Sequence, residues 1–180
     1  MKYLFPYIFI LSFVTSKAQE VDSYNQDGHT SDKHGFGLSF SMANIPVADP
    51  NATPFTVWAP TLGIEYGKRI NELWDVGILS DIELVSYELK GELDNQGDHL
   101  VRENAWVTTL TFFYHPNEHI RLFFGPGYEI EKHKNFYVTT IGFGYHMHRK
   151  KISAMPFFRV DLKGLYYSTA FGIVIGTTFK

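Results

Sequence analysis

Histidines are the residues of this chain whose type and spacing could bind a metal ion. His119, His146 and His148 lie in two neighbouring predicted strands, whose pairing would set His119 opposite His148, and Glu118 is close by. A metal centre needs three or four ligands in a closed geometry, whereas histidines at a wet rim are more often solvated. The pattern favours solvated histidines, so the sequence predicts no metal ligand.

In His29-Thr30-Ser31, the histidine and the serine have a spacing that would allow them to act as a catalytic base and a nucleophile. A serine acts as a nucleophile only when a scaffold holds the base at hydrogen-bond distance. These residues fall in segment 19–33, which is polar, lacks a hydrophobic period and is expected to be a flexible periplasmic lead-in. The sequence therefore predicts neither a catalytic residue nor a cofactor site.

Charged side chains recur at alternate positions of several segments. Residues i and i+2 of a strand share one face, so these charges collect on one side of the predicted sheet. Both signs are present, which predicts a salt-bridged interior that fills a narrow barrel, with a conducting pore as the alternative. The predicted interior set is Glu65, Arg69, Asp75, Asp81, Glu83, Arg121, Glu129, Glu131, His146, Arg159 and Asp161.

The last segment, residues 166–179, shows which kind of element positions these charges. Bulky side chains from Tyr167 to Phe179 alternate with small or polar ones, a period of two that is typical of a strand. Similar alternation recurs along the chain, with no convincing helix. The predicted strands cover residues 34–42, 55–69, 74–89, 104–115, 120–132, 136–148, 152–162 and 166–179, and residues 43–54 and 88–103 are predicted as long loops.

Short turns are expected between the strands of the C-terminal half. A two-residue turn at His133 and Lys134 would pair odd with even residues, which explains why apolar side chains change parity between the two flanking strands. Lys163 and Gly164 are expected to form a turn that obeys the same rule. Eight antiparallel strands result.

Composition limits the compartment and the partners. Residues 1–18 combine a basic start, an apolar run and small residues before a cleavage site after Ala18, which predicts a secretory signal peptide. The chain has 16 Lys and Arg against 19 Asp and Glu, so nucleic acid is not an expected partner. It contains no cysteine, so an exported protein of this size needs another source of stability, such as a closed hydrogen-bonded barrel.

Aromatic residues indicate which way the apolar face points. They lie on that face near opposite strand ends, as in interfacial belts, because an amphipathic ring places its body in hydrocarbon and its polar tip in water. This favours membrane embedding over the main rival, a soluble lipocalin-like binding barrel with its apolar face inward. The predicted extracellular belt is Trp58, Trp106, Tyr128, Tyr137 and Tyr167, and the predicted periplasmic belt is Tyr66, Trp74, Tyr114 and Tyr145.

Residues 34–180 resemble the small eight-stranded outer-membrane β-barrels of Bacteroidetes-type bacteria. The segments that carry the resemblance are Gly63-Ile64-Glu65-Tyr66-Gly67 through Trp74, Gly125-Pro126-Gly127-Tyr128-Glu129, Asn135-Phe136-Tyr137-Val138-Thr139 and Gly172-Ile173-Val174-Ile175-Gly176-Thr177-Thr178-Phe179. The resemblance implies an all-β, eight-stranded antiparallel up-and-down transmembrane β-barrel in the outer membrane. Members of this family mostly lack an assigned activity, so it implies no functional residues.

The expected role is structural or surface-interacting, without catalysis. Outer-membrane barrels have short periplasmic turns and longer extracellular loops, so residues 43–54 and 88–103 are the expected contact surface for an extracellular partner. Outer-membrane lipid and the barrel assembly machinery, through the C-terminal strand ending at Phe179, are the other expected partners. Some small outer-membrane barrels modify lipid A with a His, a Ser and an acidic partner, and such an enzyme or a small pore are less favoured alternatives.

Overall fold

The structure is a computed structural model that describes residues 34–47, 55–93, 99–132, 134–149, 152–164 and 166–179. The predicted signal peptide, residues 1–18, and the lead-in, residues 19–33, lie outside this part of the chain, so both stay predictions. Within the described ranges, no helix is long and apolar enough to cross a bilayer.

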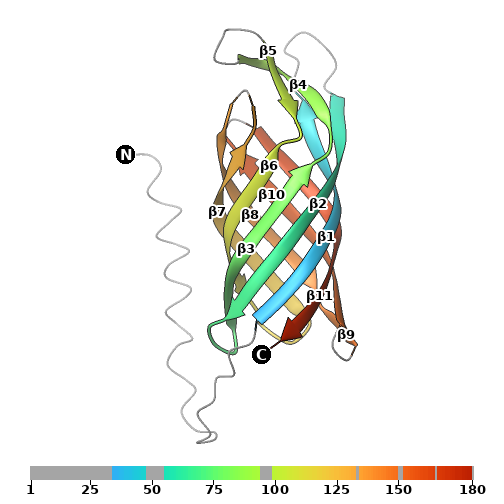
Figure 1. Ribbon diagram of the computed structural model, residues 1–180, viewed down its shortest axis with the longest axis vertical. Coiled ribbons are helices and arrows are strands. Elements are labelled where there is room, and N and C mark those ends of the chain that lie inside the picture. Colours follow the sequence, from blue (N-terminus) through green and yellow to red (C-terminus); the bar gives the residue numbers. More distant parts are fainter. Residues whose placement is uncertain are drawn as a thin grey trace, which may run out of the picture. The chain divides into compact units, whose positions relative to one another are not determined.

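The described residues form a closed antiparallel barrel of eight strands (Figure 1). Each strand pairs with its neighbour in the order β11-β1-β2-β3-β6-β7-β8-β10, and β10 pairs with β11 to close the wall. The short β9 (Met147–Arg149) continues the line of β8 along β10. The wall strands are β1 (His34–Val47), β2 (Phe55–Arg69), β3 (Trp74–Glu83), β6 (Trp106–Tyr114), β7 (Ile120–Ile130), β8 (Phe136–Tyr145), β10 (Ile152–Lys163) and β11 (Tyr166–Phe179).

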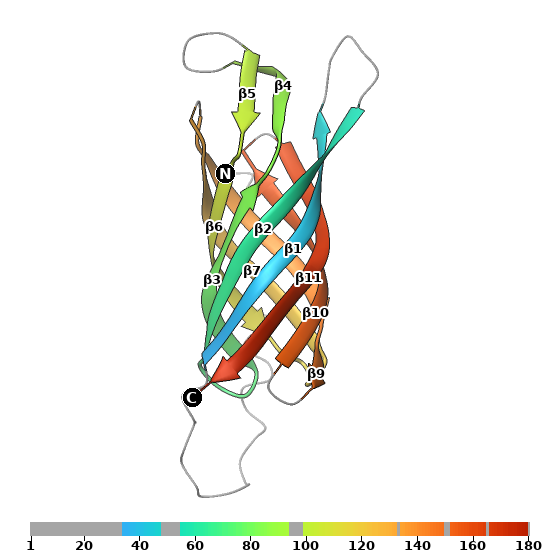
Figure 2. The same cartoon turned by 45° about the vertical axis from the view of Figure 1, so that its right-hand side comes forward.

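A two-stranded hairpin forms a separate sheet from this wall. Its strands, β4 (Ser86–Leu93) and β5 (His99–Glu103), pair only with each other and lie at one end of the barrel, which we call the hairpin end (Figure 2). The opposite end, where β11 finishes beside the start of β1, holds the turns after β2 and β6 and is called the turn end. Residues 88–103 were predicted as a loop. That prediction is wrong for most of the segment, because the chain pairs with itself there.

Two strand boundaries also differ from the prediction. β1 continues past residue 42 to Val47, and Pro46 pairs with Thr56 of β2. Proline has no backbone N–H to donate. It is tolerated at residue 46 because the pairing of β1 with β11 ends at Asn44, so no hydrogen bond to β11 is lost there. The strand predicted over residues 74–89 ends at Glu83, where the chain leaves the wall to form the hairpin.

The register of the C-terminal turns differs by two residues from the prediction. Glu129 pairs with Phe136, so the connection between β7 and β8 is longer than a two-residue turn at His133 and Lys134. Glu131 N–H donates to Asn135 Oδ1 at 2.9 Å within this connection. Between β10 and β11, Lys163 itself pairs with Tyr166, and the turn begins at Gly164, whose φ of 53° favours glycine. A shift of two residues leaves every side chain on its predicted face.

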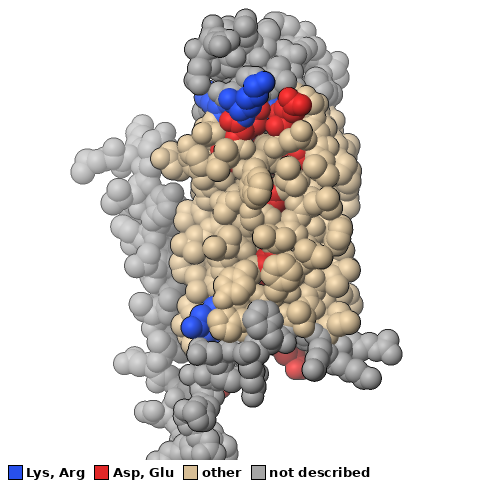
Figure 3. Space-filling view, in the orientation of Figure 1, with Lys and Arg blue, Asp and Glu red and all other residues tan. Residues whose placement is uncertain are grey.

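The faces of the wall follow the predicted alternation. Apolar side chains point outward, from Phe36 and Leu38 on β1 to Phe171 and Ile175 on β11. Figure 3 shows a broad band without exposed charge, apart from small recessed acidic spots, between charged side chains at the two ends. A barrel with its apolar side chains outward has the reverse of a lipocalin-like arrangement, so the soluble alternative is wrong.

The aromatic belts point outward as predicted. On the hairpin-end belt, Trp58 and Tyr137 expose 50% and 83% of their surface, and Tyr128 and Tyr137 pack edge to face at 5.3 Å. On the turn-end belt, the Trp74 and Tyr114 ring centroids lie 4.9 Å apart. Such rings anchor a barrel at the two interfaces of a bilayer.

The outward direction of Phe143, which is 56% exposed and pairs with Phe158 in the middle of β10, predicts a strong effect of charge. Phe143→Arg should destabilise the folded barrel by about 2–4 kcal/mol, the cost of an arginine at the bilayer midplane. Folding yield in lipid vesicles, scored by heat-modifiable migration in SDS gels, measures the loss.

The control for this prediction is an arginine at a residue that faces the interior, at a position where the lumen has space for the new side chain. Thr140 is unsuitable because it is 1% exposed and donates to Asp161 at 2.6 Å. Gly35 has nothing within 4 Å of the position that its Cβ would take. Gly35→Arg should therefore fold nearly as well as the parent, and equal losses for the two variants would contradict the assigned faces.

Candidate functional site: a filled lumen beneath a hairpin

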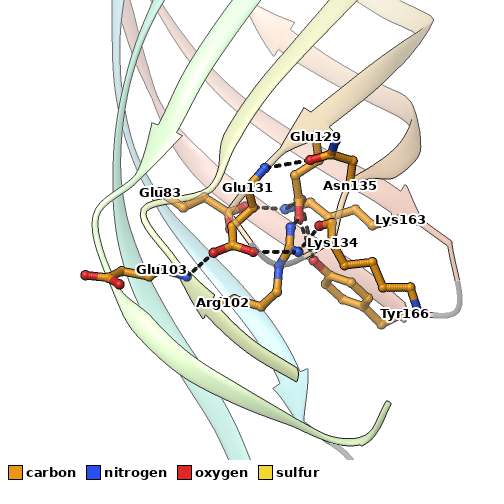
Figure 4. Close-up of polar contacts among 9 residues, drawn as sticks. All are labelled: Glu83, Arg102, Glu103, Glu129, Glu131, Lys134, Asn135, Lys163 and Tyr166. Carbon is orange, nitrogen blue, oxygen red and sulfur yellow. Dashed lines mark hydrogen bonds and ion pairs between the residues drawn. The ribbon is translucent and has the colours of Figure 1, made fainter. Parts of the chain in front are cut away.

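The hairpin end of the lumen is filled by a cluster of buried charges (Figure 4). Lys163 of β10 crosses the interior to reach Glu83 of β3 and lies 2.8 Å from Glu129 Oε2 of β7. Tyr166 adds a hydrogen bond from its hydroxyl to Glu129 Oε1 at 3.1 Å. Lys163 and Glu129 are completely buried. A buried charge is tolerated only when it is paired and hydrogen-bonded, and Lys163 and Glu129 meet that condition.

Arg102 joins the hairpin to the same cluster. It comes from β5, is 0% exposed, and its guanidinium contacts Glu129, the carbonyl oxygen of Lys134 and, at 3.3 Å, Glu131 Oε2. The backbone N–H of Glu103 also donates to Glu131 at 3.4 Å. The base of the hairpin is thus held on β7 and on the β7–β8 connection.

An apolar cap lies beside this ionic cluster. Tyr87 of β4 packs with Ile45, Ala59 and Phe136, all of which are buried. Burial raises the pKa of the Tyr87 phenol, so it stays neutral. Because the cap combines a hairpin side chain with side chains of the wall, the base of the hairpin is part of the barrel core.

A second ionic cluster occupies the middle of the lumen. Arg159 of β10 contacts Asp81 of β3, and its Nε lies 3.1 Å from Asp161 Oδ2. Ser39 donates to Asp81 at 2.8 Å, and Thr140 donates to Asp161 at 2.6 Å. Each carboxylate therefore has both a cation and a hydroxyl, which closes the lumen at mid-height.

The layer towards the turn end is apolar and carries one further ion pair. Phe113 and Phe123 pack together with ring centroids 6.2 Å apart, and Phe157 joins them. The Arg121 guanidinium lies over the Phe113 ring, 3.6 Å from its centroid, and contacts Glu65. Beyond this layer a cavity of about 550 Å³ opens towards the turn end. The expectation of a completely filled lumen is therefore wrong for this end.

The predicted interior set is largely confirmed. Arg69, Asp75 and His146 of that set are less buried than the rest, and Arg69 Nε pairs with Asp75 Oδ1 at 2.9 Å near the turn end. Of the described residues, six carboxylates and four bases are buried. They are Glu65, Asp81, Glu83, Glu129, Glu131 and Asp161, with Arg102, Arg121, Arg159 and Lys163.

Sequence reasoning missed Arg102 and Lys163, the two cations that join the hairpin-end cluster. Lys163 continues the alternation of Arg159 and Asp161 along β10, so its position carried a usable signal. Arg102 lies in a short hairpin strand whose alternation is not that of the wall, and no periodic signal marked it.

The histidines pair in a different register from the predicted one. His119 lies opposite His146, whose N–H donates to the His119 carbonyl oxygen at 2.6 Å. The His119 ring stacks on Tyr145, and the Nε2 of His115 donates to Asp75 at 2.9 Å. The described residues contain no group of three potential metal ligands. The side chain of His148, like His29 and Ser31, lies outside what the structure describes.

The pairing of Lys163 predicts a stability effect. Lys163→Met should destabilise the barrel by about 3–5 kcal/mol, because it leaves buried carboxylates without their cation. Lys163→Met combined with Glu83→Gln should lose less, since Glu83 then carries no charge. Denaturant unfolding in lipid vesicles, followed by tryptophan fluorescence, measures both. Exposed Lys132→Met is the matched control, and an equal loss there would refute the buried cluster as the cause.

No family model matches this sequence, and a search of curated proteins finds no match. Solved structures do match. Neisserial surface protein A is 8% identical, covers 81% of this chain and 97% of its own, and has a TM-score of 0.54. The N-terminal β-barrel domain of Pseudomonas aeruginosa OprF is 12% identical over 81% and 97% of the two chains, with a TM-score of 0.51.

A third similar structure is Ail, the attachment invasion locus protein of Yersinia pestis, in complex with the heparin analogue sucrose octasulfate. It is 8% identical over 82% of this chain and 99% of that chain, with a TM-score of 0.50. Identities this low show a shared fold and nothing more. The shared fold, the apolar outer wall and its two aromatic belts together identify this chain as an eight-stranded β-barrel of the outer-membrane type, which spans the outer membrane.

Proposed function

We propose that this protein is a non-enzymatic outer-membrane barrel that presents a contact surface to an extracellular partner at its hairpin end. The observation that supports this most directly is the anchoring of the hairpin. Arg102 and Tyr87 bury their side chains in the barrel, so the strands beyond them project from a rigid base. Function in such scaffolds is usually carried by the connections, which the wall holds in place.

The charge of the hairpin indicates the kind of partner. Residues 88–103 contain five acidic residues and two basic ones, and one of the two, Arg102, is turned into the barrel. Without Arg102 the segment has a net negative charge, which favours a basic partner. Ail is solved with a heparin analogue, a polyanion, and an acidic hairpin would repel such a ligand.

We propose two further partners. They are outer-membrane lipid, at the apolar wall, and the barrel assembly machinery, at β11, whose last residue is Phe179. The remaining alternatives are a lipid-modifying enzyme and a small pore. Incubation with lipid A and mass spectrometry of its acyl chains tests the enzyme.

The layered lumen predicts that the barrel does not conduct ions. In planar bilayers the purified protein should give no stable channel openings, because Arg159 with its two aspartates and the Phe113 layer block the interior in succession. A variant without the hairpin tip should be equally silent. Stable openings in the parent protein would favour the pore.

The anchored base of the hairpin predicts that changes at its tip affect partner binding and leave the folding of the barrel intact. Replacement of residues 92–100 by a short Gly-Ser turn should preserve heat-modifiable migration and protease resistance, since Tyr87 and Arg102 remain. The same replacement should abolish binding of polylysine to vesicles that carry the protein. Glu92→Gln, Asp94→Asn and Asp98→Asn together should weaken that binding without shortening the chain.

Two outcomes would contradict this proposal. Loss of protease resistance would show that the tip belongs to the fold and is not an appended contact surface. Unchanged polylysine binding in both variants would show that the hairpin is not the acidic surface responsible.

A further inference from the structure

The cavity at the turn end lies on the opposite side of the filled layers from the hairpin. Its volume of about 550 Å³ is within the range of about 300–1,000 Å³ that is usual for small-ligand sites. One wall is formed by glycines of β1, β2 and β11, among them Gly35, Gly67 and Gly176. Nothing lies within 4 Å of a Cβ added to Gly35, so this wall leaves open space in front of the backbone.

The floor of the cavity holds a guanidinium and a carboxylate in fixed positions. Arg121 stacks on Phe113, and its Nη1 contacts Glu65 and lies 3.8 Å from Met155 Sδ. Its Nη2 is 3.9 Å from the position that a Cβ on Gly67 would take, on the glycine wall. Both floor side chains are nearly buried, with 6% and 11% of their surface exposed. A ligand that reached the floor would therefore meet a donor and an acceptor side by side.

Four charged side chains of the cavity form two ion pairs. Arg121 pairs with Glu65, Arg69 pairs with Asp75, and Asp75 also accepts a hydrogen bond from His115 at 2.9 Å. A ligand with a single charge would add an unpaired charge beside the nearly buried Arg121 and Glu65, which is costly. Exposed carboxylates of Glu72 and Glu118 line the cavity as well, and they disfavour simple anions further.

We propose that this cavity binds a small zwitterion, such as an amino acid or a dipeptide, from the turn end. The carboxylate of the ligand accepts hydrogen bonds from Arg121 and its ammonium group donates to Glu65, so binding leaves the net charge of the site unchanged. The site is independent of the hairpin and of its proposed partner. It faces the end that corresponds to the periplasm if the hairpin is extracellular.

Three matched probes test this proposal on the full barrel in lipid nanodiscs. Glycylglycine carries both charges, N-acetylglycine only the negative one and glycinamide only the positive one. Amide chemical shifts of Gly35 and Gly67 should move and saturate with millimolar glycylglycine. The two singly charged probes should bind at least about tenfold more weakly, as expected for loss of a charged hydrogen bond. Equal affinities for the three probes, or no shift with glycylglycine, would overturn the proposal.

Two variants locate the site. Gly67→Val should abolish binding, because its side chain would cover Arg121 Nη2, and a Cβ there makes only ordinary contacts. Glu65→Gln should reverse the preference, so that N-acetylglycine binds better than glycylglycine. Outward-facing Leu38→Val, on β1 but not in the lining of the cavity, is the control and should bind like the parent. Heat-modifiable migration confirms that each variant is folded, and folded variants that bind all three probes like the parent would place the ligand elsewhere.

Discussion

A charge inside a barrel of eight strands has little water to solvate it, and this constraint organises the interior. The wall has its apolar side outward, so polar residues that alternate with it must point inward. Their charges are then far from bulk water on every side, and each must find an opposite charge or a hydroxyl. Lys163 between Glu83 and Glu129, and Arg159 between Asp81 and Asp161, are the solutions that this sequence adopts.

The wall could be predicted because its period is local. Alternate residues of a strand face opposite sides, so the outward position of Phe143 and the inward position of Glu129 follow from parity alone. The strand ends at residues 55–69 and 166–179 were also correct, since charged or glycine-containing turns mark them. Parity is unaffected by a register shift of two residues, which is why the faces were right while the pairing of His119 was wrong.

The hairpin and its anchor could not be predicted, because they do not depend on a local period. Residues 88–103 lack the long alternation of the wall and contain turn-forming residues, so they were assigned to a loop. What orders their base is the contact of Arg102 and Tyr87 with residues far away in the chain. A tertiary contact of this kind leaves no periodic trace in the sequence. Likewise, the turn-end cavity depends on glycines from three strands that meet only after the barrel closes.

The ion pairs of the lumen also have a consequence for how the chain folds. Lys163 and Glu83 are 80 residues apart, Arg159 and Asp81 are 78 apart, and both pairs join β10 to β3 across the interior. A growing sheet that contains β3 but not yet β10 carries these carboxylates without their cations. Partly assembled walls are then electrostatically unfavourable in lipid, and contacts so distant in sequence form slowly. We therefore expect insertion and closure to occur together, with few stable intermediates that hold only some of the strands.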